Sequence, residues 1–214
     1  MKIELKQLSP YIHHVRFDTR HDMCSTLVRI AEYYESPFFH GKIFTLSQFK
    51  KWYMKSQKKK TFTYYKDWSG YNIPSKELKP FFDGRFNPLS KKEKQFLELF
   101  KNIKGKYYII GTYRKDRAEQ QAIDHEVSHA MFWMNRQYKS QVKAYIKDKD
   151  HKELADKIIK MGYANKVLID EINAYLSADL PWLRKKKKLK GKQYSKYAKD
   201  LILIKKRHKK SLYN

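Results

Sequence analysis

The sequence predicts an α+β fold that is mostly helical and contains a small mixed β-sheet. Most segments of the 214-residue chain space their apolar side chains as helices do. One segment, 106–114, is instead rich in Tyr and Ile, as strands are. Hydrophobic residues make up 41% of the chain, which is enough for a packed core. A single cysteine excludes an internal disulfide framework, which suits a reducing compartment.

Three helices are expected in the first half of the chain. Apolar spacing predicts the first two over 25–36 and 45–56. The third covers 88–105, because Ser90 and Glu93 have the spacing of a capping box. These helices supply apolar faces that need a partner, and the predicted strand 106–114 follows directly after the third.

The aromatic stretch 60–75 is interpreted as a strand followed by an exposed loop. Its first residues are β-rich, and the pattern then breaks at Gly70 and Pro74. Trp68 has two interpretations: it forms one wall of a binding cleft, or it fills the core. Filling the core is the preferred one.

The second half of the chain predicts only helices. A long helix is expected over 116–135, with Asp116 as its N-cap. Two more follow near 136–149 and 151–161. A last core helix covers 165–180 and ends where proline cannot continue it.

The C-terminal residues differ sharply in composition from the rest. Residues 184–214 hold 14 Lys or Arg and a single acid, Asp200, and so contribute +13 of the net charge of +26. We therefore expect one folded domain over 1–183 and a basic tail over 184–214. The tail is either solvated and disordered or contains one short amphipathic helix, around 194–204.

The stretch AIDHEVSHAMFWMN (122–135) contains two histidines four residues apart, His125 and His129, with Glu126 between them. On a helix this spacing places both imidazoles on one face. Two ring nitrogens can then reach one zinc ion at about 2.0–2.1 Å. Glu126 projects beside them, where a carboxylate can take a proton from water and pass it to a leaving amine. This is the HExxH arrangement; two histidines without a metal are the alternative.

A zinc site of this kind needs a third protein ligand. The three-histidine metzincin pattern is excluded, because Phe132 and Asn135 stand where it requires Gly and His. Glu171, on the predicted helix 165–180, is the preferred ligand. It shares one helical stripe with residues that would allow another helix to approach closely: Val167, Ala174 and Ala178.

Two other residues compete with Glu171, and three more could support the site. His151 and Glu153 are possible ligands, but their charged surroundings are typical of a solvent-facing segment. A ligating histidine usually hydrogen-bonds a second group through its other nitrogen. Asp170, Asn173 and Tyr175 are the candidates for that role, and the sequence does not rank them.

The chain resembles the gluzincin metallopeptidases at two places. HEVSHA (125–130) is followed by an E-x-x-A-x-x-x-A pattern over 171–178. The glutamate helix is similar to that of the ImmA/IrrE-type peptidases, and the long spacing is similar to that of the anthrax lethal factor peptidase domain. The resemblance implies a minimal zincin-like core, in which a small sheet packs on an active-site helix and a glutamate helix.

The same resemblance implies the roles of particular residues. His125, His129 and Glu171 would bind zinc, with Glu126 as general base. A substrate strand would lie along an edge strand formed by 107–113. A Tyr or His usually stabilises the oxyanion in such sites, and the candidates here are Tyr163 and Tyr175. An ordinary core or surface tyrosine is the alternative for each.

A second resemblance covers residues 15–180. It is to a family of uncharacterised bacterial and giant-virus proteins that is sometimes labelled an ABC transporter ATPase. An ATPase of that class binds phosphate through a G-x-x-x-x-G-K-[ST] loop, and this chain has no such loop. The label therefore predicts nothing about the chemistry of this chain.

The net charge of +26 predicts attraction to polyanions: nucleic acid, an anionic membrane or an acidic partner. Binding of nucleic acid through 184–214 would be non-specific and salt-dependent. The N-terminus lacks the apolar region of a secretory signal, and the apolar runs are too short to span a bilayer. We expect a soluble protein that is intracellular or packaged in a virion.

Three functions are consistent with these residues. The leading hypothesis is a zinc-dependent hydrolase of gluzincin type, a peptidase with a peptide or protein substrate. The alternative is a basic protein, associated with nucleic acid or packaged in a virion, whose zinc site is structural or vestigial. A zinc hydrolase that acts on a non-peptide amide is the third.

Overall fold

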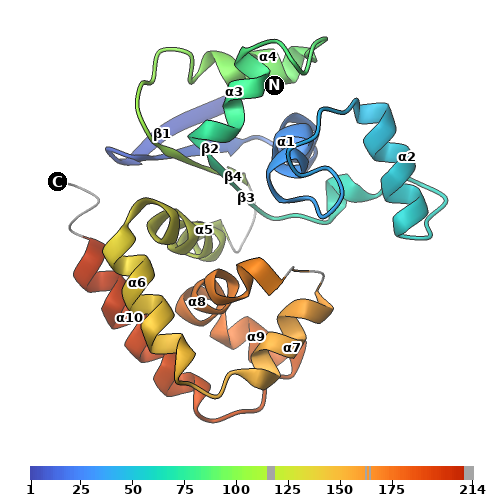
Figure 1. Ribbon diagram of the computed structural model, residues 1–214. Coiled ribbons are helices and arrows are strands. Elements are labelled where there is room, and N and C mark those ends of the chain that lie inside the picture. Colours follow the sequence, from blue (N-terminus) through green and yellow to red (C-terminus); the bar gives the residue numbers. More distant parts are fainter. Residues whose placement is uncertain (115–118, 162, 164, 210–214) are drawn as a thin grey trace. The chain divides into compact units, whose positions relative to one another are not determined.

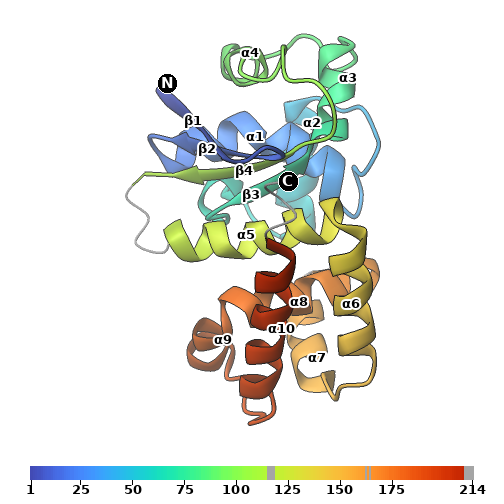
Figure 2. The ribbon, with the colours of Figure 1, turned by 90° about the vertical axis from the view of Figure 1, so that its left-hand side faces the viewer.

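The computed structural model describes residues 1–114, 119–161, 163 and 165–209. The chain divides into two compact units, Met1–Glu119 and Gln120–Asn214. The fold class is confirmed: the protein is α+β and mostly helical, with one mixed four-stranded sheet. All four strands belong to the first unit, and the described part of the second unit is built from helices (Figures 1 and 2).

The sheet has the strand order β1-β2-β4-β3. β1 (Ile3–Ser9) pairs with β2 (Ile12–Phe17) antiparallel, and β2 pairs with β4 (Tyr108–Tyr113) parallel. On its other side β4 pairs with β3 (Tyr71–Pro74) antiparallel. The predicted strand near 106–114 is thus confirmed, but the expectation that it forms an edge is wrong. β2 pairs with the whole of β4 and β3 pairs with Tyr108–Gly111, so β4 is an inner strand of this sheet.

Two strands escaped prediction because neither alternates between buried and exposed residues. β2 is buried at five of its six positions, and β1 is exposed at four consecutive positions of its seven. The strand expected early in 60–75 is also misplaced: Tyr64–Lys66 forms a 3₁₀ helix, and β3 follows after Gly70. Trp68 does not fill the core, since it is 40% exposed. Tyr64 and Tyr71 are the core residues of this stretch.

The helices predicted in the first unit are confirmed, with shifted ends. α1 (Arg20–Glu35) begins five residues early, after its N-cap Thr19, and α2 (Leu46–Ser56) begins after Thr45. The capping box of α4 (Lys91–Glu98) forms as predicted, although this helix ends well before Gly105. The remaining helix is the short α3 (Lys79–Phe82).

α1 packs against the sheet through β2, β3 and β4. Gly111 in β4 makes this close approach possible, because a Cβ atom there would lie 2.8 Å from Leu27 Cδ1. The contact buries Val15, Phe17 and Ile109 with Leu27 in one apolar cluster. Burial of such side chains stabilises the unit by about 1.5–3 kcal/mol each.

In the second unit, α8 (Leu168–Ala178) contacts each of its neighbours α6, α7, α9 and α10. Glu171 and the five residues after it are all buried. The predicted helices are confirmed, although Asp116, the expected N-cap of the first, lies outside the described residues. The other helices are α5 (Glu119–Met134), α6 (Arg136–Lys147), α7 (Lys152–Lys160), α9 (Leu180–Lys187) and α10 (Tyr194–Lys209). No helix in the described ranges has the length and apolar content needed to cross a bilayer.

Most of the expected tail is folded into this second unit. α10 confirms the amphipathic helix expected around 194–204 and contacts α6, α8 and α9. Apolar residues placed among the lysines are buried: Leu189, Tyr194, Ala198, Leu201 and Ile204. The two compact units divide after Glu119. The division into a domain over 1–183 and a tail over 184–214 stays a prediction. The sheet and the helices α5 and α8 belong to different units, so their packing on one another stays a prediction.

Candidate metal centre

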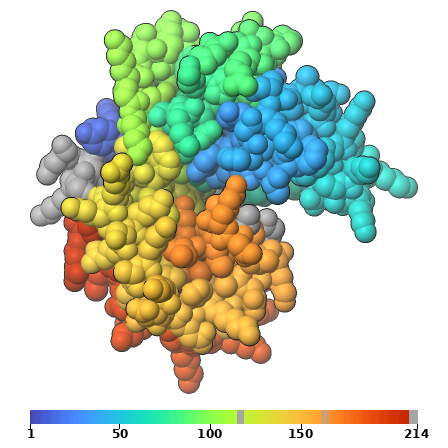
Figure 3. All heavy atoms as spheres, viewed as in Figure 1, coloured from blue at the N-terminus to red at the C-terminus, as the bar shows by residue number. Residues whose placement is uncertain are grey.

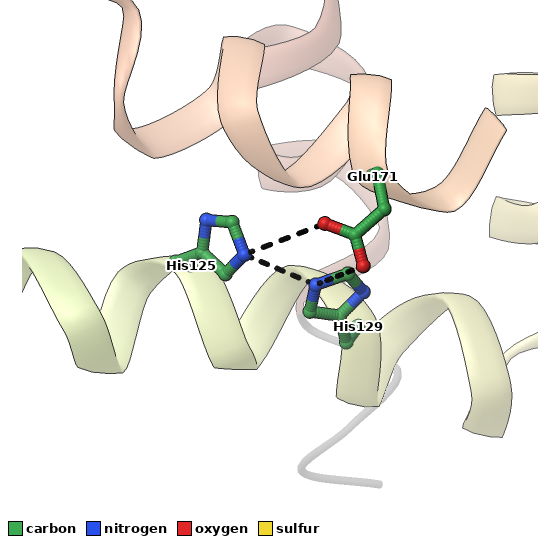
Figure 4. Close-up of side chains that lie close together, drawn as sticks. All are labelled: His125, His129 and Glu171. Atoms are coloured by element: carbon green, nitrogen blue, oxygen red, sulfur yellow. Dashed lines mark hydrogen bonds and ion pairs between the residues drawn. The ribbon is translucent and has the colours of Figure 1, made fainter. Parts of the chain in front are cut away.

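The histidines of the HExxH stretch lie one turn apart on α5 and face Glu171 on α8 (Figure 4). The two Nε2 atoms of His125 and His129 are 3.1 Å apart. Glu171 Oε1 lies 3.7 Å from His129 Nε2, and Glu171 Oε2 lies 4.0 Å from His125 Nε2. These three side chains therefore present one ligand atom each to a common point, and they could hold a metal ion.

Each histidine turns its other ring nitrogen toward an aspartate. Asp179 Oδ2 lies 2.5 Å from His125 Nδ1, and Asp170 Oδ1 lies 3.0 Å from His129 Nδ1. Gln121 Nε2 donates to the other oxygen of Asp179, which holds that carboxylate in place. The hydrogen bond with Asp179 keeps the proton on His125 Nδ1, so the Nε2 atom of His125 carries the lone pair. A proton or a metal cation must lie between the two Nε2 atoms, because two bare lone pairs 3.1 Å apart would repel each other.

Carboxylates crowd this cluster without enough donors. In the described part of the chain, Glu126 Oε2 and Glu171 Oε2 are buried and accept no hydrogen bond. The pKa of Glu171 is raised to about 7, mainly by burial and also by the nearby charges of Asp170 and Glu126, against the opposing effect of the two histidines. A bound cation would lower the pKa of Glu171 again, because a nearby positive charge favours the ionised carboxylate.

The carboxylates around His129 raise its pKa. Burial alone would lower it, but the carboxylates of Asp170 and Glu171 prevail and hold it well above its usual value. Without a metal, the cluster therefore retains protons at neutral pH in place of a cation. A metal ion would have to displace those protons, since ligating groups must be deprotonated.

Tyr175 lies directly against the cluster, and Tyr163 contacts Tyr175. The ring of Tyr175 meets the ring of His125 edge-on at 4.8 Å between centroids and stacks on Trp182. The hydroxyl oxygens of Tyr163 and Tyr175 are 3.2 Å apart. Burial raises the pKa of both tyrosines, and the negative charge of Glu171 raises both further. Both hydroxyls therefore keep their protons and can donate hydrogen bonds.

The other residues singled out from the sequence have different roles. Asn173 accepts a hydrogen bond from Tyr138, so it does not support a histidine. His151 bonds the carbonyl of Lys149, and Glu153 accepts from two backbone N–H groups at the start of the segment before α10. Of the three supporting candidates, Asp170 alone contacts a ring nitrogen of a candidate ligand.

Sequence reasoning missed Asp179 and Gln121. Asp179 is 54 residues from His125 and lies between α8 and α9, where an acid reads as an ordinary N-cap. Gln121 lies four residues before His125, one turn earlier on α5, and its spacing could have drawn attention to it.

Lys205 ties α10 to the turn of α5 that carries His125. Its Nζ donates to the carbonyl of Asp124 and to Ser128 Oγ, both at 2.8 Å. Burial lowers the pKa of Lys205 to about 8. The basic C-terminal segment therefore supports the helix on which the candidate ligands lie.

Comparison of the chain with protein-family models, with curated proteins and with solved structures gives no match. The site is described by its own geometry: two imidazoles and one carboxylate meet, and an aspartate contacts each imidazole from outside. These residues could hold a metal ion.

Proposed function

We propose that the protein is a zinc-dependent hydrolase of gluzincin type, a peptidase whose zinc ligands are His125, His129 and Glu171. The facing Nε2 atoms carry this proposal, together with the third ligand beside them. Tetrahedral zinc with ligands at 2.0–2.1 Å separates its ligand atoms by about 3.3 Å. The separations here are 3.1, 3.7 and 4.0 Å, so small rotations of Glu171 would complete the set.

The donor set favours zinc in a catalytic form. Imidazole and carboxylate are common zinc ligands, and three protein ligands leave a fourth position for water or substrate. A bound zinc ion would supply a Lewis acid that activates water and polarises the substrate carbonyl. Structural zinc sites usually have four protein ligands. Among the described residues, this group has three: His125, His129 and Glu171.

Particular side chains of this chain would carry the remaining steps. Glu126, next to His125 and with an unpartnered oxygen, would accept the proton of the attacking water and donate it to the leaving nitrogen. Tyr175 would donate a hydrogen bond to the developing oxyanion, and Tyr163 would orient the Tyr175 hydroxyl. Asp170 and Asp179 would hold the imidazoles in place.

The test combines metal analysis with a cleavage assay. We expect about one zinc per chain by plasma mass spectrometry, loss of zinc in His129→Ala, and retention of zinc in Glu126→Gln. Against a peptide library, Glu126→Gln should lose turnover by at least about 10²-fold. His151→Ala is the matched control, since His151 lies in the same unit but outside the cluster. Zinc that survives His129→Ala, or full activity in Glu126→Gln, would remove the assignment.

The second candidate function is binding of nucleic acid through the basic segment after residue 183. Residues 120–183 hold nine Lys or Arg and nine acids, so their net charge is zero. The whole net charge of the second unit, +13, therefore comes from 184–214. In α9 and α10 the apolar faces are buried and cations such as Lys185, Lys186 and Lys199 are exposed. In this alternative the protein is associated with nucleic acid or packaged in a virion, and its zinc site is structural or vestigial.

Deletion of residues 184–214 is not a clean test of that function, because it would remove core residues such as Leu201. Lys185, Lys186 and Lys190 are exposed, so the variant K185Q/K186Q/K190Q removes charge without touching the core. If each lysine contacts a phosphate, the slope of log affinity against log salt for duplex DNA should fall by about 3. An unchanged slope would exclude this surface, and K143Q/K147Q/K152Q is the control with equal charge.

A further inference from the structure

A second basic region lies in the first unit, far from the candidate metal ligands in the sequence. Between Glu35 and Asp67 the chain has eight lysines and no acid. This segment contains α2 and the loops on either side of it, drawn in blue to cyan in Figure 3, where long side chains project from the surface. Seven of the eight lysines are exposed, and Lys50 is half-buried.

The charge of this region is uncompensated. Among the described residues, no carboxylate lies within ion-pair distance of any of these lysines. Elsewhere in the same unit lysines do find acids, as Lys79 does with Asp83 and Lys92 with Asp22. A run of cations that the protein leaves unpaired favours a polyanionic partner over an internal role.

Aromatic rings lie among these lysines. Phe38 is 49% exposed and stacks on Trp52 of α2, with ring centroids 5.6 Å apart and planes 17° apart. Lys42 Nζ lies 4.3 Å from the centroid of the Phe38 ring. Trp52 in turn packs on the buried ring of Phe49, which anchors the pair to the core. A half-exposed ring on a rigid base, with a cation beside it, is suited to stacking against a nucleobase.

We propose that this α2 surface, formed by Phe38, Lys42, Lys51, Lys55 and Lys60, binds single-stranded nucleic acid. The lysines contact successive phosphates, and an unpaired base stacks on Phe38. Lys51 and Lys55 lie one helical turn apart on the exposed side of α2, and Lys60 follows shortly after its C-terminal end. A duplex keeps its bases stacked inside, so Phe38 distinguishes single strands from duplexes.

The same residues argue against a membrane as the partner. An interfacial helix binds lipid through its apolar face. In α2 that face is used by the core, because Phe49 and Tyr53 are buried. The side of α2 left to solvent is polar and cationic: Ser47, Gln48, Lys51 and Lys55. This surface belongs to the first unit, whereas α9, α10 and the candidate metal ligands belong to the second.

The experiment measures binding of the full chain to labelled oligothymidylate of about 20 nucleotides and to a duplex of the same length, by fluorescence anisotropy at several salt concentrations. For K51Q/K55Q/K60Q we expect the slope of log affinity against log salt for the single strand to fall by about 2. The control is K91Q/K94Q/K104Q, which removes the same charge from exposed lysines of the same unit and should leave the slope unchanged.

Phe38→Ala tests the stacking contact independently of charge. We expect it to weaken single-strand binding about 5- to 100-fold and duplex binding less than about twofold. Equal weakening of both, or a lysine variant that behaves as its control does, would overturn the proposal. So would binding to phosphatidylserine vesicles that these variants abolish while oligonucleotide binding stays intact. Circular dichroism of each variant confirms that the fold is retained.

Discussion

Two buried clusters of ionisable side chains, one in each unit, differ in how completely they are satisfied. In the first unit, Arg29 forms a bidentate ion pair with Glu93, in which both N–O distances are 2.7 Å. Arg29 also donates to the carbonyls of Phe86 and Pro88, and Glu93 accepts from the backbone of Ser90. In the second unit, the described carboxylates of Glu126 and Glu171 each leave one oxygen without a donor.

The difference separates a structural cluster from a candidate functional one. Buried polar groups are nearly always hydrogen-bonded, so a cluster that lacks donors has the capacity to take up a ligand. Arg29 and Glu93 use their groups on each other and on nearby backbone, and they fix α1 against α4. The cluster around Glu171 lacks positive charge, although the chain as a whole carries +26.

The largest effect on stability is expected from breaking the satisfied cluster. Arg29→Ala would leave Glu93 buried without its partner, so the free energy of unfolding should fall by about 3–5 kcal/mol. Urea denaturation measures the change. Lys92→Ala, which removes a more exposed ion pair with Asp22, should cost no more than about 1 kcal/mol. Zinc content should stay the same in both variants; a cost below 1 kcal/mol for Arg29→Ala would contradict the comparison.

The second prediction concerns pH in the metal-free protein. The pKa of Glu171 rises from its usual 4.5 to about 7 on folding, so the folded state binds more protons than the unfolded state between these values. Stability must therefore fall as pH rises through this window, by about 3 kcal/mol for Glu171 at 1.4 kcal/mol per pH unit. The raised pKa of His129 acts in the same direction, since its contribution is lost as pH rises above 6.5.

Thermal unfolding between pH 5 and pH 8, with chelator and with zinc, measures this dependence. Zinc should remove the loss of stability, because the ion replaces the protons. Glu171→Gln should flatten the dependence in chelator and abolish the effect of zinc. A metal-free protein whose stability rises over this range would show that the cluster is not short of positive charge.

The smallest effect is expected from the aspartates that contact the histidines. Asp179→Asn or Asp170→Asn should weaken zinc affinity about 10- to 100-fold without abolishing binding. Competition with a chromogenic chelator measures the affinity. Asp200→Asn is the control, because Asp200 bonds Tyr145 away from the cluster. If neither aspartate changes the affinity, the metal is held in another way.

Local patterns predicted much of the structure. The capping box of Ser90 and Glu93 formed, and helices are present near each predicted range, because caps and apolar spacing act within one or two turns. β2 could not be predicted from an alternating pattern, since it is buried between β1 and β4, and β4 lies nearly a hundred residues later; β1 shows no alternating pattern either.

The sequence by itself determined that His125 and His129 share one face of a helix, because that follows from four-residue spacing alone. Only the tertiary structure decided the rest of the site. Packing of α8 beside α5 brings in Glu171, and the turn into α9 brings Asp179 to His125. The structure also decided that the lysine-rich segment is part of the fold, because apolar residues such as Leu201 are identified as core only once α10 packs on α8.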